Sequence, residues 1–90
     1  MSTVFDLNES HVALAHITDA LFCSELKTGE NPTRRQLAAA IRKALQEHRN
    51  WNGCTRAVAA AFARTPDTAT EREQWCRRLA EETLDEPRRG

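Results

Sequence analysis

The sequence lacks the features that direct a protein into or across a membrane. Its opening stretch, MSTVFD, has neither the basic residues nor the apolar run of a secretory signal. No apolar run elsewhere approaches the length that is needed to span a bilayer. We therefore expect a cytoplasmic protein that makes no contact with a membrane.

An excess of either charge is also missing, because thirteen basic residues balance thirteen acidic ones. A neutral total argues against a dedicated nucleic-acid-binding protein, which usually carries a net positive field. The charges are nevertheless unevenly placed. Residues 1–31 carry one basic and five acidic side chains, residues 32–66 seven and one, and residues 67–90 five and seven. The simplest interpretation is that these segments neutralise one another within the fold.

Signs of disulfide, metal or cofactor chemistry are few. The three cysteines, Cys23, Cys54 and Cys76, are odd in number and widely spaced, so they do not form a disulfide framework. Free thiols are usual in a reducing compartment. The chain has no Cys-x-x-Cys or His-x-x-x-His pair, so we expect no bound metal and no cofactor.

Signatures of catalysis are missing as well. The sequence has no Gly-rich phosphate loop. His16 and Asp19 share a helical face, but no nucleophile is placed by sequence to complete a triad with them. We expect no enzyme activity, and no small-molecule substrate is indicated.

What the sequence does contain is helical periodicity. The pattern predicts an all-α protein, a compact bundle of about four helices, over residues 6–27, 34–49, 54–64 and 68–84. Three capping boxes predict helix starts, at Asp6–Glu9, Thr33–Gln36 and Thr68–Glu71. Residues 1–84 form one domain in this prediction, and residues 85–90 form a disordered tail.

The turns between these segments are marked by a few residues. Trp51 falls in a predicted turn over residues 50–53, where we expect it to anchor the chain against the core. Pro66 either ends the third helix or opens the fourth.

The segment 6–27 has apolar residues on two opposite faces, whereas a surface helix needs only one. One face carries leucines and Ile17, and the opposite face carries Val12, Ala15, Phe22 and Leu26. Either both faces are buried within the monomer, or the second face docks another chain. We adopt the second hypothesis, with a second copy of the chain or another protein as the partner.

Three arginines repeat along the segment 34–49. Arg35, Arg42 and Arg49 are seven residues apart, a spacing that places them on one ridge of a continuous helix. Guanidinium groups favour phosphate or carboxylate partners, so this ridge is a candidate contact for an anion or an acidic protein surface. The alternative is a solvated face.

The segments 54–64 and 68–84 also allow a helix-turn-helix interpretation. Ala59 and Ala63 have the spacing of small residues in that motif. Glu71 and Glu73 would then lie near the end that enters the groove, where carboxylates repel phosphate. A nucleic-acid-binding regulator is therefore our alternative to an interaction module or adaptor.

Composition suggests one resemblance. Ala is the commonest residue, eleven of the thirteen basic residues are Arg, and tryptophans mark WNGC at 51–54 and WC at 75–76. In this style the chain resembles small all-helical proteins of high-GC bacteria. No function is attached to that group, so the resemblance implies no site residues.

Overall fold

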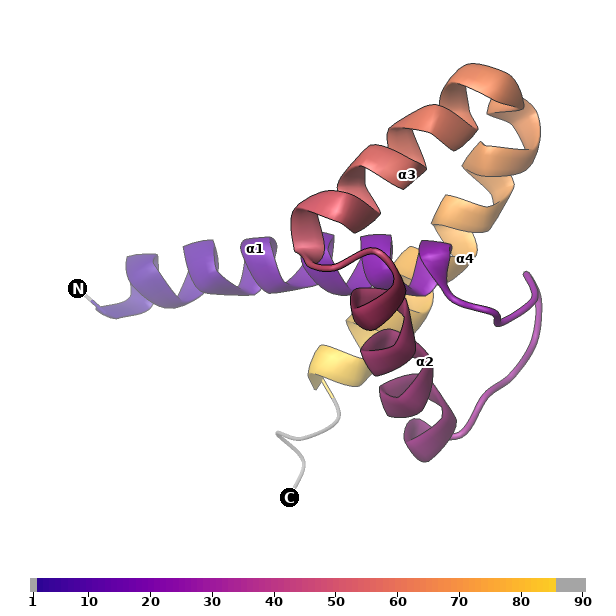
Figure 1. Ribbon diagram of the computed structural model, residues 1–90. Helices are drawn as coiled ribbons and strands as arrows, with labels where there is room; N and C mark the ends of the chain where they lie inside the picture. The colour runs from indigo at the N-terminus through magenta and orange to yellow at the C-terminus, as the bar shows by residue number, and fades with distance from the viewer. Residues whose placement is uncertain (1, 86–90) are drawn as a thin grey trace.

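The computed structural model describes the backbone of residues 2–85 and the side chains of residues 12–84. These residues form four helices and no strand, which confirms the predicted all-α bundle. The helices are α1 (Ser2–Cys23), α2 (Arg34–Glu47), α3 (Trp51–Arg64) and α4 (Pro66–Asp85) (Figure 1). Within this described part, no helix is both long and apolar enough to cross a membrane. The predicted tail, apart from Asp85 at the end of α4, lies outside the described residues.

The first helix organises the others. α1 contacts α2, α3 and α4, and α3 and α4 form an antiparallel hairpin beside it (Figure 1). The C-terminal half of α1 lies among the other helices, whereas its N-terminal half extends beyond them. The C-terminal end of α1 therefore belongs to the core.

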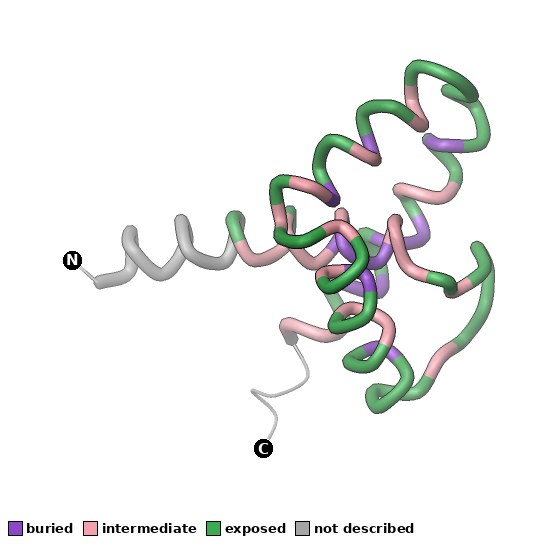
Figure 2. Tube along the Cα trace, viewed as in Figure 1, coloured by how far each residue is buried: buried purple, intermediate pink, exposed green. Residues whose placement is uncertain are grey.

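The core forms where α1, α2 and α4 meet (Figure 2). Burial of its apolar side chains removes them from water, which is the main force that holds such a bundle together. The main cluster consists of Leu21, Leu37, Trp75, Cys76, Leu79 and Ala80. A second cluster joins α1, α2 and α3 through the small residues Ala20, Ala44 and Cys54.

The capping box that was predicted for α2 is confirmed. The hydroxyl of Thr33 accepts from the backbone N–H of Gln36 at 3.1 Å, and the side-chain oxygen of Gln36 accepts from the N–H of Thr33 at 2.8 Å. Both bonds satisfy donors that the helix itself leaves without partners. This start was predictable because all the atoms involved lie within four residues.

The other two capping boxes are wrong. α1 begins at Ser2, so Asp6 lies inside the helix; the chain has no glycine or proline before Gly29 to interrupt it. α4 begins at Pro66, so Thr68 lies in its first turn. Thr65 donates its N–H to the carbonyl of Ala61 and accepts from the N–H of Ala69, so one residue both ends α3 and starts α4.

The predicted start of the third helix is also wrong. α3 begins at Trp51 rather than at residue 54, because Asn50 is its N-cap. The side-chain oxygen of Asn50 accepts from the N–H of Gly53 at 2.9 Å. Trp51 is consequently the first residue of a helix and does not belong to a turn.

Two predicted helix ends were placed too late. α1 ends at Cys23 instead of residue 27, and Ser24 closes it by donating its N–H (3.1 Å) and its hydroxyl (2.6 Å) to the carbonyl of Leu21. α2 ends at Glu47, and Arg49 follows with a φ of 77°, in the left-handed region. A residue in that conformation cannot continue a right-handed helix.

Candidate protein-interaction site

The C-terminal end of α1 is covered by Arg72 of α4. Its Nε donates to the carbonyl of Phe22 at 2.8 Å, and its Nη2 donates to the carbonyls of Leu21 (3.3 Å) and Ser24 (3.1 Å). Its Nη1 donates to the hydroxyl of Thr28 at 3.0 Å. The last carbonyls of a helix lack internal partners and carry partial negative charge, so a guanidinium group is well suited to them.

The same guanidinium group is held between aromatic rings. It lies 5.5 Å from the centroid of Phe22 and 5.6 Å from that of Trp75, within the range of cation–π attraction. The ring of Phe22 also stacks on Phe62 of α3, with centroids 6.2 Å apart. Phe22 therefore packs within the monomer, and the prediction that it lies on an open face is wrong.

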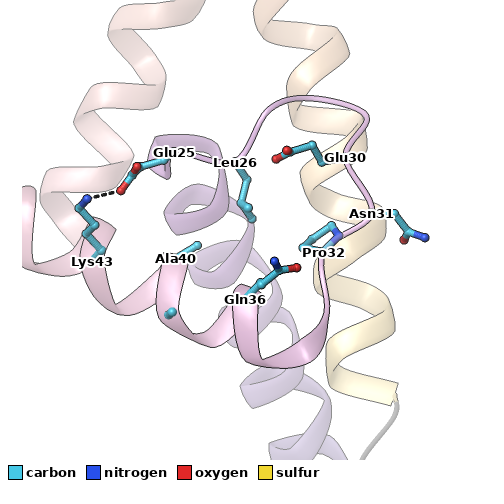
Figure 3. Close-up of a pocket in the computed structure, with 9 residues that line it drawn as sticks. Glu25, Leu26, Glu30, Asn31, Pro32, Gln36, Ala40 and Lys43 are labelled. Carbon is cyan, nitrogen blue, oxygen red and sulfur yellow. Dashed lines mark hydrogen bonds and ion pairs between the residues drawn. The ribbon is translucent and has the colours of Figure 1, made fainter.

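Leu26 is displaced from the predicted face because it lies beyond the end of α1. It packs against the main core cluster and lines a recess of about 380 Å³ between the α1–α2 loop and α2 (Figure 3). Most of the charged and amide groups around this recess have partners: Glu25 pairs with Lys43, Glu30 accepts from the N–H of Lys27 at 2.8 Å, and Gln36 belongs to the capping box. They hold the loop on α2 and leave few groups for a ligand.

Val12 and Ala15 are exposed, unlike Phe22 and Leu26. Val12 is 53% exposed and is the one large apolar side chain of residues 12–84 that stands out in this way. Beside Ala15 is a recess of about 310 Å³ between α1 and α4. We call Val12 together with the lining of this recess the α1 docking surface: Val12, Leu14, Ala15, Thr18, Asp19, Glu73 and Arg77.

The place at which α3 begins explains why α1 is exposed at Val12. Towards the C-terminal end of α1, the carboxylate of Asp19 accepts from the hydroxyl of Thr55 at 2.8 Å. One turn earlier, the ring of His16 stacks on Trp51 with centroids 4.8 Å apart. Trp51 is the first residue of α3, so the cover that α3 gives to α1 stops there.

Known proteins offer no guide to this surface. No family model, curated protein sequence or solved structure matches the chain. The geometry and the charges of the chain itself are therefore what bears on its function.

The three arginines do not form the predicted ridge. Arg35 and Arg42 are exposed on α2, but Arg49 lies beyond its end in the left-handed conformation.

The helix-turn-helix interpretation meets a related difficulty. α3 and α4 are joined by Thr65 alone, whereas the turn of that motif has three or four residues.

The cysteines contribute to packing. The thiol of Cys23 donates to the carbonyl of Cys54 at 3.4 Å, and all three cysteines are free. Burial raises the pKa of Cys23 and of Cys76 to about 12 and also raises that of Cys54, so the thiols stay protonated near neutral pH. Among the described residues, no group of three or more Cys, His, Asp or Glu side chains could hold a metal ion.

Sequence reasoning missed Arg72, although a signal was present. Arg72 precedes Trp75 and Cys76 by three and four residues, so it belongs to the stripe of α4 that faces the core. A basic residue on a buried stripe needs a specific partner. The carbonyls at the C-terminal end of α1 are that partner. The last turn of α1 contains no basic residue of its own that could interact with them.

Proposed function

We propose that the protein is a small protein-interaction module, an adaptor that receives another chain on the α1 docking surface. The observation that carries this proposal is the exposure of Val12 where the cover of α3 stops. Val12 and Ala15, three residues apart on α1, form the exposed apolar part of this surface, and Asp19 and Glu73 line the recess beside Ala15. An apolar centre with a polar rim is the usual composition of a protein–protein interface.

Other functions are supported less well. The separation of Arg49 from Arg35 and Arg42 removes the ridge on which a phosphate contact was based. The thiols, with raised pKa values, favour a structural role over nucleophilic chemistry. Free cysteines also agree with a reducing compartment, and we propose that the protein acts in the cytoplasm.

Site-specific photo-crosslinking in the native cell tests this function. A benzophenone amino acid is placed at Ala15, in the docking surface, and at Ala59, which is exposed on α3, as the matched control. We expect a polypeptide adduct of defined mass at position 15 but not at position 59. The adduct should disappear in the Val12→Asp variant, because a carboxylate in the apolar centre must be desolvated on docking.

The outcome also shows whether the module pairs with itself. An adduct of twice the mass of the chain identifies a second copy, and any other mass identifies a different protein. Equal adducts at positions 15 and 59, or adducts that persist after Val12→Asp, would mean that the α1 docking surface is not the interface.

A further inference from the structure

The charge of α1 restricts the kind of partner that fits. Its 22 residues include three acidic side chains, Asp6, Glu9 and Asp19, and no lysine or arginine. The first basic residue of the whole chain is Lys27, beyond the end of this helix. Among the described side chains of α1, a partner therefore meets the negative charge of Asp19 and no lysine or arginine.

The part of the rim that α4 contributes carries charges of both signs, but its net charge is also negative. Asp19 and Glu73 are partly buried on either side of the recess. Arg77 is the one basic residue in its lining, and its Nε lies 3.5 Å from the carboxylate of Glu81, one turn further along α4. With Arg77 offset by Glu81, the two remaining carboxylates give the α1 docking surface a net negative rim.

A second copy of the chain matches this rim poorly. In a two-fold dimer the same patch faces itself, so Asp19 and Glu73 of one copy would approach the acidic rim of the other. Like charges brought together at an interface repel each other while losing water. Arg77 is too exposed and too close to Glu81 to neutralise both carboxylates.

The shape of the surface favours a helix as the occupant. α1 already receives one helix, because α3 packs along it through the contacts of Trp51 with His16 and of Thr55 with Asp19. Val12 lies on α1 one turn before His16, on which the first residue of α3 stacks, so an incoming helix could follow α3 along α1.

We infer that the α1 docking surface binds a basic amphipathic helix of another protein, an inference that rests on the proposed function above. The apolar side chains of that helix cover Val12 and Ala15, and its lysines or arginines lie beside Asp19 and Glu73. This is the common mode in which a helix places its apolar face in a groove, with charge complementarity selecting the partner.

Two synthetic peptides test the charge of the partner. Both are 18-residue amphipathic helices with leucine on one face; one carries lysine on the other face, and its matched control carries glutamate. Titration into the isotope-labelled full chain, followed by amide chemical shifts, should give saturable shifts near Val12, Ala15 and Glu73 with the lysine peptide only. Binding should weaken severalfold when salt is raised from about 0.05 to about 0.5 M.

Two variants locate the electrostatic contact. Asp19→Asn and Glu73→Gln each remove one charge and keep an oxygen acceptor, and each should weaken the lysine peptide by about two- to fivefold. Glu71→Gln, at an exposed position of the same helix outside the recess, is the matched control and should leave the affinity unchanged. Circular dichroism of each variant verifies that the helices are retained.

The inference is overturned if the two peptides bind equally, if the shifts lie elsewhere, or if the control variant weakens binding as much as the other two. It is also overturned if light scattering shows a dimer that Val12→Asp dissociates, because a second copy then occupies the surface. A specific adduct at position 15 without binding of the lysine peptide would leave the proposed function intact and reject only the basic helix. Absence of a specific adduct would reject both.

Discussion

At the scale of single residues, Arg72 joins parts of the chain that are fifty residues apart. Its guanidinium group satisfies the carbonyls of Leu21, Phe22 and Ser24 and lies against two aromatic rings. Removing it leaves the end of α1 without these donors, in a region where Phe22 and Trp75 restrict the access of water.

We expect Arg72→Ala to lower the free energy of unfolding by about 2–4 kcal/mol, because hydrogen bonds from a charged donor and the helix-end attraction are lost together. Arg72→Lys should retain only part of the stabilisation that Arg72 provides, because an ammonium group lacks the planar shape of the guanidinium group. Urea unfolding followed by circular dichroism measures both. Arg78→Ala, at an exposed position of the same helix, is the control and should change stability by less than about 0.5 kcal/mol. Equal losses for Arg72→Ala and Arg78→Ala would contradict this role.

At the scale of helices, two similar sequence patterns have different outcomes. Thr33 caps α2, whereas Thr68 lies in the first turn of α4 because Pro66 and Thr65 start that helix earlier. Proline at the first helical position loses no hydrogen bond, since its missing donor would have had no partner within the helix. The position of Pro66 decides which threonine serves as a cap.

This difference predicts unequal costs for the same substitution. Thr33→Ala should lower the free energy of unfolding by about 1 kcal/mol, because the N–H of Gln36 loses its acceptor. Thr68→Ala, at an exposed site outside any cap, should change it by less than about 0.5 kcal/mol. Thermal or urea unfolding of the two variants in parallel provides the comparison. A larger cost at Thr68 would show that α4 starts where its capping box predicted.

The sequence predicted the structural features that depend on residues close together in the chain. It did not predict the features that depend on contacts between residues far apart in the chain. The four helices and the cap at Thr33 follow from spacing within a few positions. The end of α1 depends on Arg72, and the burial of Phe22 depends on Phe62, and neither is visible from the sequence of α1. Of the predicted interaction face, Val12 and Ala15 are exposed, whereas Phe22 and Leu26 are half-buried and pack within the monomer; that this face binds another chain stays a prediction.

At the scale of the whole molecule, the shape reflects the direction in which α1 runs. The radius of gyration is 13.3 Å and the extents are 41 × 27 × 25 Å. A globular chain of this length is expected near about 12 Å. The excess agrees with a helix whose N-terminal half extends beyond the others (Figure 1). α1 therefore contributes to the core at its C-terminal end and, at Val12, to an exposed surface.

Two substitutions on α1 should separate these roles. Phe22→Glu places a charge between Phe62 and Arg72 in the packed region and should remove more than about 3 kcal/mol, enough to unfold much of a domain this small. Val12→Asp changes a side chain that is 53% exposed and should leave helix content and stability nearly unchanged. Circular dichroism with light scattering distinguishes them, and the inferred partner predicts that the wild type remains monomeric. A folded Phe22→Glu variant would show that Phe22 lies at an interface after all.

The contact between Arg72 and the end of α1 has a consequence for synthesis. The donor follows Phe22 by fifty positions, and ribosomes add about 5–20 residues per second, so α1 is made about 3–10 s before Arg72. Until then the contacts of α1 with α4 cannot form, so the face of α1 that α4 covers is left without its partner. The hairpin of α3 and α4 depends mainly on contacts close in sequence and should assemble sooner once its residues emerge. Completion of the core therefore waits until nearly the whole polypeptide has been made.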